Sequence, residues 1–168
     1  MLTIARITII TPKYFTTVYI AFVNILAFLV LVFMEILAEL AIKMWGDHEP
    51  AELADEFREL AEKDDAVCFI KYADDKPIAF AQCQLRYDYV EGTESSPVGY
   101  LEGIFVSEGY RKQELAAELL AECEKWTKEK GCTEFASDCE LDNETSLRFH
   151  LAFGFEEANR LICFRKVL

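Results

Sequence analysis

The sequence predicts an α/β protein with a mixed, mostly antiparallel central sheet flanked by helices. Apolar residues recur at helical spacing in two consecutive segments, 35–45 and 51–63. Three segments with the composition of strands follow at 66–73, 78–90 and 98–106, and polar turns separate them. Strand and helix patterns then alternate toward the C-terminus. Two helices, a meander and a strand–helix–strand unit build a mixed sheet with helices on both faces.

Each element carries its own signal. "AVCFIKYA" and "IAFAQCQLRYDYV" are joined by "DDKP", which predicts a hairpin. "VGYLEGIFV" contains two glycines, which often mark a bulge or a close backbone approach. A helix is expected over 114–130, a strand over 132–138, a helix over 143–153 that ends at Gly154, and a final strand over 160–168.

The N-terminal third is unlike the rest. Residues 14–34 contain no charged side chain, and these 21 residues are long enough to span a membrane as a helix. The alternatives are a buried strand or helix of the domain, or an abnormal N-terminus joined to an ordinary enzyme. "LTIARITII" before it is β-branched and predicts a first strand. We therefore divide the chain into an atypical hydrophobic segment, 1–33, and a domain, 34–168.

Composition restricts the function. The net charge of −13 makes the phosphate backbone of a nucleic acid an unfavourable partner. An acidic surface favours cationic small molecules, although ordinary solubility explains it too. The six cysteines have no C-x-x-C spacing, which favours reduced thiols in a cytoplasmic protein. With two histidines and no H-x-x-x-H pattern, no metal site is expected.

The stretch "GYRKQELAAELL" predicts a basic turn that opens into a helix. Backbone N–H groups at a helix N-terminus are unpaired and bind phosphate well. The stretch is therefore a candidate phosphate site.

"GIFV" before "YRKQELA", and "NETSLRFHLAFGF" near the end, resemble the GNAT acetyltransferases. "RYDYVEGTESSPVGYLEGIFV" and "CTEFASDCELDN" resemble the aminoglycoside 6′-N-acetyltransferases of the chromosomal bacterial type. The resemblance covers about residues 35 to 168. It implies a GNAT fold, acetyl-CoA as co-substrate without a metal, an aminoglycoside as acceptor, a role in antibiotic resistance, and a homodimer in which the C-terminal strands pack together.

The resemblance also implies the residues that bind acetyl-CoA. The strand backbone at Ile104, Phe105 and Val106 would hold the acetyl group and pantetheine arm, and Asn143 would hydrogen-bond that arm. The pyrophosphate would bind the loop and helix start, which consist of Arg111, Lys112, Gln113, Glu114, Leu115, Ala116 and Ala117. Glu114 replaces the central glycine of the family pattern. A carboxylate beside two phosphates is repulsive, so we expect reduced affinity for acetyl-CoA, although glutamate also suits the first turn of a helix.

The acceptor side is implied to be acidic and aromatic, and its residues are Trp45, Tyr89, Glu102, Asp138 and Asn159. Carboxylates and aromatic faces suit a polycationic sugar. Asp138 would bind the reactive amine and could help to remove its proton. Glu102 could do the same through a water, so the general base is left unassigned. His150 stands where many members of the superfamily have the tyrosine that protonates the thiolate. Asn159 occupies a place where close relatives often carry an acid.

Three readings remain open on the sequence alone. The first is an aminoglycoside 6′-N-acetyltransferase in which the amine attacks acetyl-CoA directly. The second keeps the fold and changes the acceptor to another polyamine or a metabolite amine. The third is a GNAT-like binding protein whose cofactor site is impaired by Glu114 and which contacts a membrane through residues 14–34.

Overall fold

The structure, a computed structural model, describes residues 3–6, 30–46 and 48–168 of the chain. A helix covers residues 30–41. The other elements, in chain order, are β1 (Thr3–Arg6), α2 (Pro50–Ala61), β2 (Ala66–Ala73), β3 (Lys76–Arg86), β4 (Val98–Val106), a 3₁₀ turn η1 (Glu108–Tyr110), α3 (Leu115–Glu129), β5 (Phe135–Ser137) and α4 (Glu144–Ala152).

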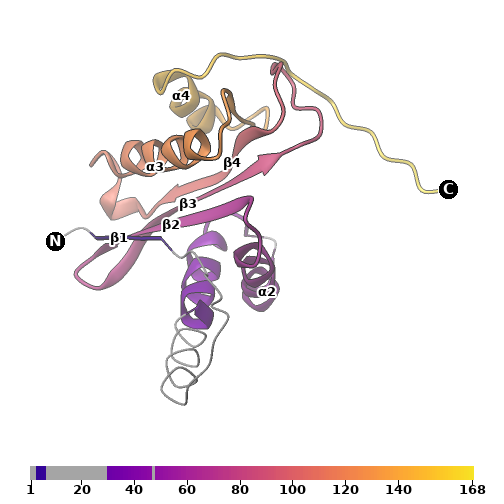
Figure 1. The fold of residues 1–168 in the computed structure, drawn as a ribbon. Coiled ribbons are helices and arrows are strands. Elements are labelled where there is room, and N and C mark those ends of the chain that lie inside the picture. The colour runs from indigo at the N-terminus through magenta and orange to yellow at the C-terminus, as the bar shows by residue number, and fades with distance from the viewer. Residues whose placement is uncertain (1–2, 7–29, 47) are drawn as a thin grey trace, which may run out of the picture.

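The five strands form one sheet in the order β1-β2-β3-β4-β5 (Figure 1). Every neighbouring pair is antiparallel except β4 and β5, which are parallel and are connected through α3. The prediction of a mixed, mostly antiparallel sheet is therefore confirmed.

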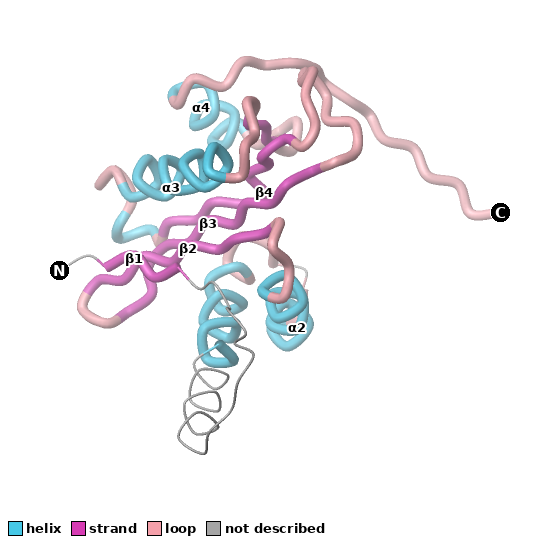
Figure 2. Tube along the Cα trace, in the orientation of Figure 1, coloured by secondary structure: helices cyan, strands magenta, loops and turns pink. Residues whose placement is uncertain are grey.

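Helices cover both faces of the sheet (Figure 2). Successive side chains of a strand point to opposite faces, and β3 shows both environments. Phe80 packs with the helix over 30–41 and with α2, whereas Ala79 and Ala81 pack with α3. The sheet is buried on both sides, which explains the apolar composition of "IAFA" in this strand.

The first helix begins before the predicted domain boundary. Val30 packs against the core, and Phe33 and Met34 are buried in it. The boundary at residue 34 thus falls inside a helix that belongs to the folded domain. Residues 14–29, most of the candidate membrane stretch, lie outside the described residues. Within the described segments, no helix combines the length and apolar character needed to cross a membrane.

The predicted first strand is present in part, because Thr3–Arg6 pairs antiparallel with Phe69–Tyr72 of β2. The predicted final strand over 160–168 is wrong for the single chain. That segment has no regular secondary structure and extends away from the sheet (Figure 1). A strand needs a hydrogen-bonded neighbour, and the segment's own sheet supplies none along these residues.

Candidate active site

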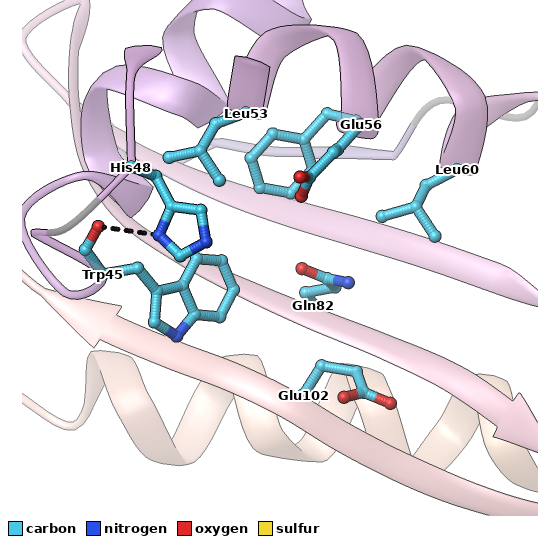
Figure 3. A pocket seen from close by; sticks show the side chains of 8 residues that line it. Trp45, His48, Leu53, Glu56, Leu60, Gln82 and Glu102 are labelled. Atoms are coloured by element: carbon cyan, nitrogen blue, oxygen red, sulfur yellow. Dashed lines mark hydrogen bonds between the residues drawn. The ribbon is translucent and has the colours of Figure 1, made fainter. Parts of the chain in front are cut away.

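A cavity of about 310 Å³ lies between the helices of one face and the sheet (Figure 3). The segment after the first helix, together with α2, β3 and β4, supplies its walls. The lining residues are Trp45, His48, Leu53, Glu56, Phe57, Leu60, Gln82 and Glu102. Two of the predicted acceptor residues, Trp45 and Glu102, therefore meet in one cavity, which is both apolar and acidic.

An extra residue in β4 directs Glu102 into this cavity. Gln82 of β3 faces Gly103 and Cys83 faces Leu101, so Glu102 has no partner of its own in the register. Such a bulge interrupts the alternation of side chains and re-aims one of them. Gly103 then lies beneath Trp45, and a Cβ at Gly103 would come within 2.8 Å of the indole atom Cζ2. The sequence prediction that a glycine here marks a bulge or a close approach is confirmed on both counts.

Arg86 at the end of β3 holds Glu102 in place. Its Nε and Nη2 donate to the two carboxylate oxygens of Glu102 at 3.0 and 2.8 Å. The guanidinium carbon lies 3.3 Å from the ring centroid of Tyr100, which is a cation–π contact. Burial alone would lower the pKa of Arg86, but the hydrogen bonds and charge of Glu102 raise it.

Asp138 belongs to the same neighbourhood. It follows β5 directly, and its charge acts on both Arg86 and Tyr100. Burial first, and the charge of Asp138 next, raise the pKa of Tyr100 to about 12, so the phenol keeps its proton at neutral pH. Glu102 on β4 and Asp138 after the neighbouring β5 thus both act through their charges on Arg86 and Tyr100.

Tyr89 and Asn159, two other predicted acceptor residues, both hydrogen-bond to Glu91. The hydroxyl of Tyr89 donates to Glu91 at 3.1 Å, and Nδ2 of Asn159 donates to the other oxygen of Glu91 at the same distance. Glu91 therefore puts a carboxylate beside Asn159. Tyr89 itself is 81% exposed, and neither it nor Asn159 lines the cavity.

Within the part of the chain that the structure describes, the second half of β4 has no strand paired with it on the side of β5. The parallel pairing ends where Leu101 faces Ser137, and the Ser137 hydroxyl donates to the Leu101 carbonyl at 3.0 Å. Residues 104–106 continue beyond that point and are half-buried. Their backbone N–H and C=O groups on this side are open to an extended ligand, as a sheet edge is to an added strand.

The loop after β4 turns sharply into α3. Nε of Arg111 donates to the Val106 carbonyl at 3.0 Å, which ties the loop to the strand end. Lys112 and Glu114 adopt the left-handed conformation, with φ of 63° and 62°. Glu114 is the N-cap of α3, and its side chain caps no N–H group. The first amides of α3 are therefore left for an anion.

Asn143 and His150 lie on α4. The Asn143 side chain accepts from the Ser146 amide at 3.0 Å and so caps the helix. Nδ1 of His150 lies 2.8 Å from the Ser146 carbonyl and donates to it, while Nε2 is buried without a protein partner among the described residues. Nε2 can donate a proton only when the ring is doubly protonated. The acid role of His150 stays a prediction.

The model of the acetyltransferase (GNAT) family matches residues 33–155. The chain belongs to this family.

Curated relatives within the family share one name. The chain is 42% identical over 128 residues to the aminoglycoside N(6′)-acetyltransferase type 1 of Acinetobacter haemolyticus. The matched region covers 76% of this chain and 88% of that protein. The protein of the same name from Salmonella typhimurium is 43% identical over 125 residues, covering 74% of this chain and 86% of the relative.

A solved structure extends the likeness. Aminoglycoside acetyltransferase AAC(6′)-Iy, in complex with a bisubstrate analogue that joins CoA to an acetylneamine, superposes with a TM-score of 0.80 at 32% identity. The match covers 100% of this chain and 99% of that one. Among the described residues, the N-cap side chain of α3 bonds none of the first amides and one edge of the second half of β4 has no strand neighbour, a geometry that suits an extended, phosphate-bearing cofactor. No group of three or more metal-binding side chains occurs among the described residues.

Several residues of the site were missed by the sequence analysis. Arg86 and Tyr100 lie at predicted strand positions and look like ordinary strand residues. Gln82 could have been found, because a polar side chain on the same face as Phe80 interrupts an apolar strand that is otherwise buried. It is 8% exposed and borders the cavity (Figure 3).

Proposed function

We propose that this GNAT enzyme transfers the acetyl group of acetyl-CoA to the 6′-amine of an aminoglycoside. The observation that carries the proposal is the cavity, which is lined by the Trp45 indole and the carboxylates of Glu56 and Glu102; Glu102 comes two residues before the open half of β4. A cationic sugar suits such a lining, because carboxylates accept charge-assisted hydrogen bonds and the indole face attracts ammonium groups. The names of the relatives support the same acceptor.

One set of residues would bind acetyl-CoA, and a second set would bind the aminoglycoside. The backbone of Ile104, Phe105 and Val106 would hold the acetyl end of the co-substrate, and the residues from Arg111 to Ala117 would hold its pyrophosphate. Asn143, besides capping α4, would bind the pantetheine arm. Bound acetyl-CoA supplies a thioester that an unprotonated amine attacks.

On the acceptor side, Asp138 would accept a hydrogen bond from the reactive amine. Glu102, whose two carboxylate oxygens both accept from Arg86, would orient the acceptor or a bridging water. Tyr89 would contact the sugar from the rim, together with the Glu91–Asn159 pair. His150 would return a proton to the thiolate in its doubly protonated form.

The test is a transfer assay with two aminoglycosides that differ only in carrying an amine or a hydroxyl at the 6′ carbon. Release of free thiol from acetyl-CoA is followed, and the product is identified by its mass. We expect turnover with the 6′-amine and none with the 6′-hydroxyl compound. Turnover with both would place the acetyl group elsewhere, and turnover only with simple polyamines would favour the second acceptor class.

We also propose that the enzyme is a homodimer in which the C-terminal segments pack together. The segment after residue 159 exposes five large apolar side chains, and the exposed fraction of Phe164 is 92%. These residues are Leu161, Ile162, Phe164, Val167 and Leu168. Exposed apolar surface on this scale is typical of an interaction site. Pairing with a second copy would give the segment the strand neighbour that its own sheet does not offer.

Light scattering after size exclusion tests the dimer. We expect twice the chain mass for the full-length protein and the monomer mass for a variant that lacks residues 160–168. A monomeric full-length protein at all concentrations would contradict this proposal.

We place the enzyme in the cytoplasm, since all six cysteines are free thiols and thiols persist in reducing compartments.

A further inference from the structure

Two carboxylates border the acceptor cavity from opposite walls. Glu102 projects from β4, and Glu56 projects from α2 toward the same space (Figure 3). Only Glu102 belongs to the acceptor residues that the family resemblance suggests. The two glutamates differ in the charge that surrounds them.

The charge of Glu102 is already compensated. Arg86 binds both of its oxygens, and the exposed fraction of the Glu102 side chain is 18%. A cation that approaches Glu102 therefore meets an ion pair rather than a free anion, and it is also repelled by the guanidinium. Glu102 keeps lone pairs for hydrogen bonds, but its pull on a distant ammonium group is weak.

The charge of Glu56 is not compensated. Glu56 is exposed on α2, and the hydrogen bonds and ion pairs of the described residues do not include it. The nearest cation along the helix, Arg58, is paired with Asp55 instead. His48 is the other titratable group that lines the cavity, and its Nδ1 lies 3.4 Å from the Trp45 carbonyl. Among the described residues that line the cavity, Glu56 is thus the carboxylate without an ion pair.

Glu56 is also remote from the transfer site in the sheet order. α2 packs against β2, whereas Asp138 follows β5 at the opposite end of the sheet. Glu102 on β4 lies between them. An acceptor whose reactive amine is at Asp138 would extend past Glu102 toward α2, and a second cationic group at that distance would reach Glu56.

We infer that Glu56 binds an ammonium group of the acceptor other than the one that is acetylated, and so selects for polycationic acceptors. This inference rests on the proposed function. It makes Glu56 a specificity-determining residue and leaves the Arg86–Glu102 pair as a fixed, neutral hydrogen-bonding element. The recognised chemistry is a second primary amine on the sugar scaffold, held by a charge-assisted hydrogen bond.

The experiment compares Glu56→Gln with Glu59→Gln, an exposed glutamate of the same helix that does not line the cavity. KM and kcat are measured at about pH 8, where an imidazole is neutral, for acceptors with more and fewer amines. Calorimetric titration of the same acceptors into both variants gives a binding constant that does not depend on turnover. The inference can therefore be tested even if the wild-type protein transfers no acetyl group.

We expect Glu56→Gln to raise KM and Kd for the amine-rich acceptor about tenfold, equal to about 1.4 kcal/mol, with kcat within roughly twofold. The acceptor with fewer amines should bind almost as before, and the salt dependence of KM should become shallower. Glu59→Gln should match the wild type. An unchanged affinity in Glu56→Gln, or an equal loss for both acceptors, would overturn the inference.

Discussion

At the residue scale, single side chains arrange the loops around the site. The Glu134 carboxylate accepts from the Ser95 amide at 2.6 Å, from the Glu94 amide at 3.0 Å and from the Ser95 hydroxyl. It thereby ties the loop between β3 and β4 to the start of β5. That loop carries Tyr89 and Glu91, and β5 leads to Asp138, so one carboxylate helps to align both rims of the acceptor site.

Glu134 makes stability depend on pH. The hydrogen bonds from Ser95 lower its pKa in the folded state. A lowered pKa gives stability that is present above the ordinary carboxyl pKa and is lost as pH falls through the folded value. We expect Glu134→Gln to lower the melting temperature at neutral pH, with a difference from wild type that shrinks below about pH 4. A difference that stays constant from pH 7 to about pH 3 would contradict this origin.

At the element scale, the bulge in β4 decides which side chains reach the cavity. The segment "VGYLEGIFV" predicts the strand with its correct bounds, and its glycines predict an irregularity. The sequence does not reveal that Glu102 is the unpaired residue, because the register depends on β3, and side-chain alternation alone does not fix it. Arg86 was missed for the same reason, since its role comes from a cross-strand ion pair.

Gly103→Ala tests the close approach of Trp45. A Cβ at position 103 would meet the indole at 2.8 Å and the Met44 methyl at 2.5 Å, so the ring must shift. We expect KM for the aminoglycoside to rise on the order of tenfold, with little change in acetyl-CoA binding. Steady-state kinetics check this result. Gly109→Ala is the control, because a Cβ there has no neighbour within 4 Å. Equal KM values for the two variants would refute the packing argument.

At the scale of the whole molecule, local patterns predicted most of the fold. β2 and β4 have the predicted bounds, and the ends of α2 and α3 differ from the prediction by one or two residues. The strand predicted over 160–168 is not formed, because its composition suits a strand but its own sheet offers it no hydrogen-bonded neighbour. The predicted boundary at residue 34 divides the helix over 30–41, because the uncharged run gives no sign that Val30 and Phe33 pack in the core.

The loop at Glu114 carries an unusual residue for its backbone conformation. A left-handed φ of 62° favours glycine, which explains physically why the family pattern places glycine there. Glutamate holds this conformation at a cost of about 1 kcal/mol and adds a negative charge at the candidate phosphate site. We therefore expect this loop to bind acetyl-CoA with reduced affinity.

The most direct measurement is calorimetric titration of acetyl-CoA into the wild-type protein, Glu114→Gly and Glu114→Gln. The account predicts that all three bind, and that both variants bind on the order of tenfold more tightly because each removes the same negative charge. Melting temperatures measured in parallel show that the variants fold. Binding by none of the three folded proteins would contradict the central claim that this loop and the open edge of β4 form an acetyl-CoA site.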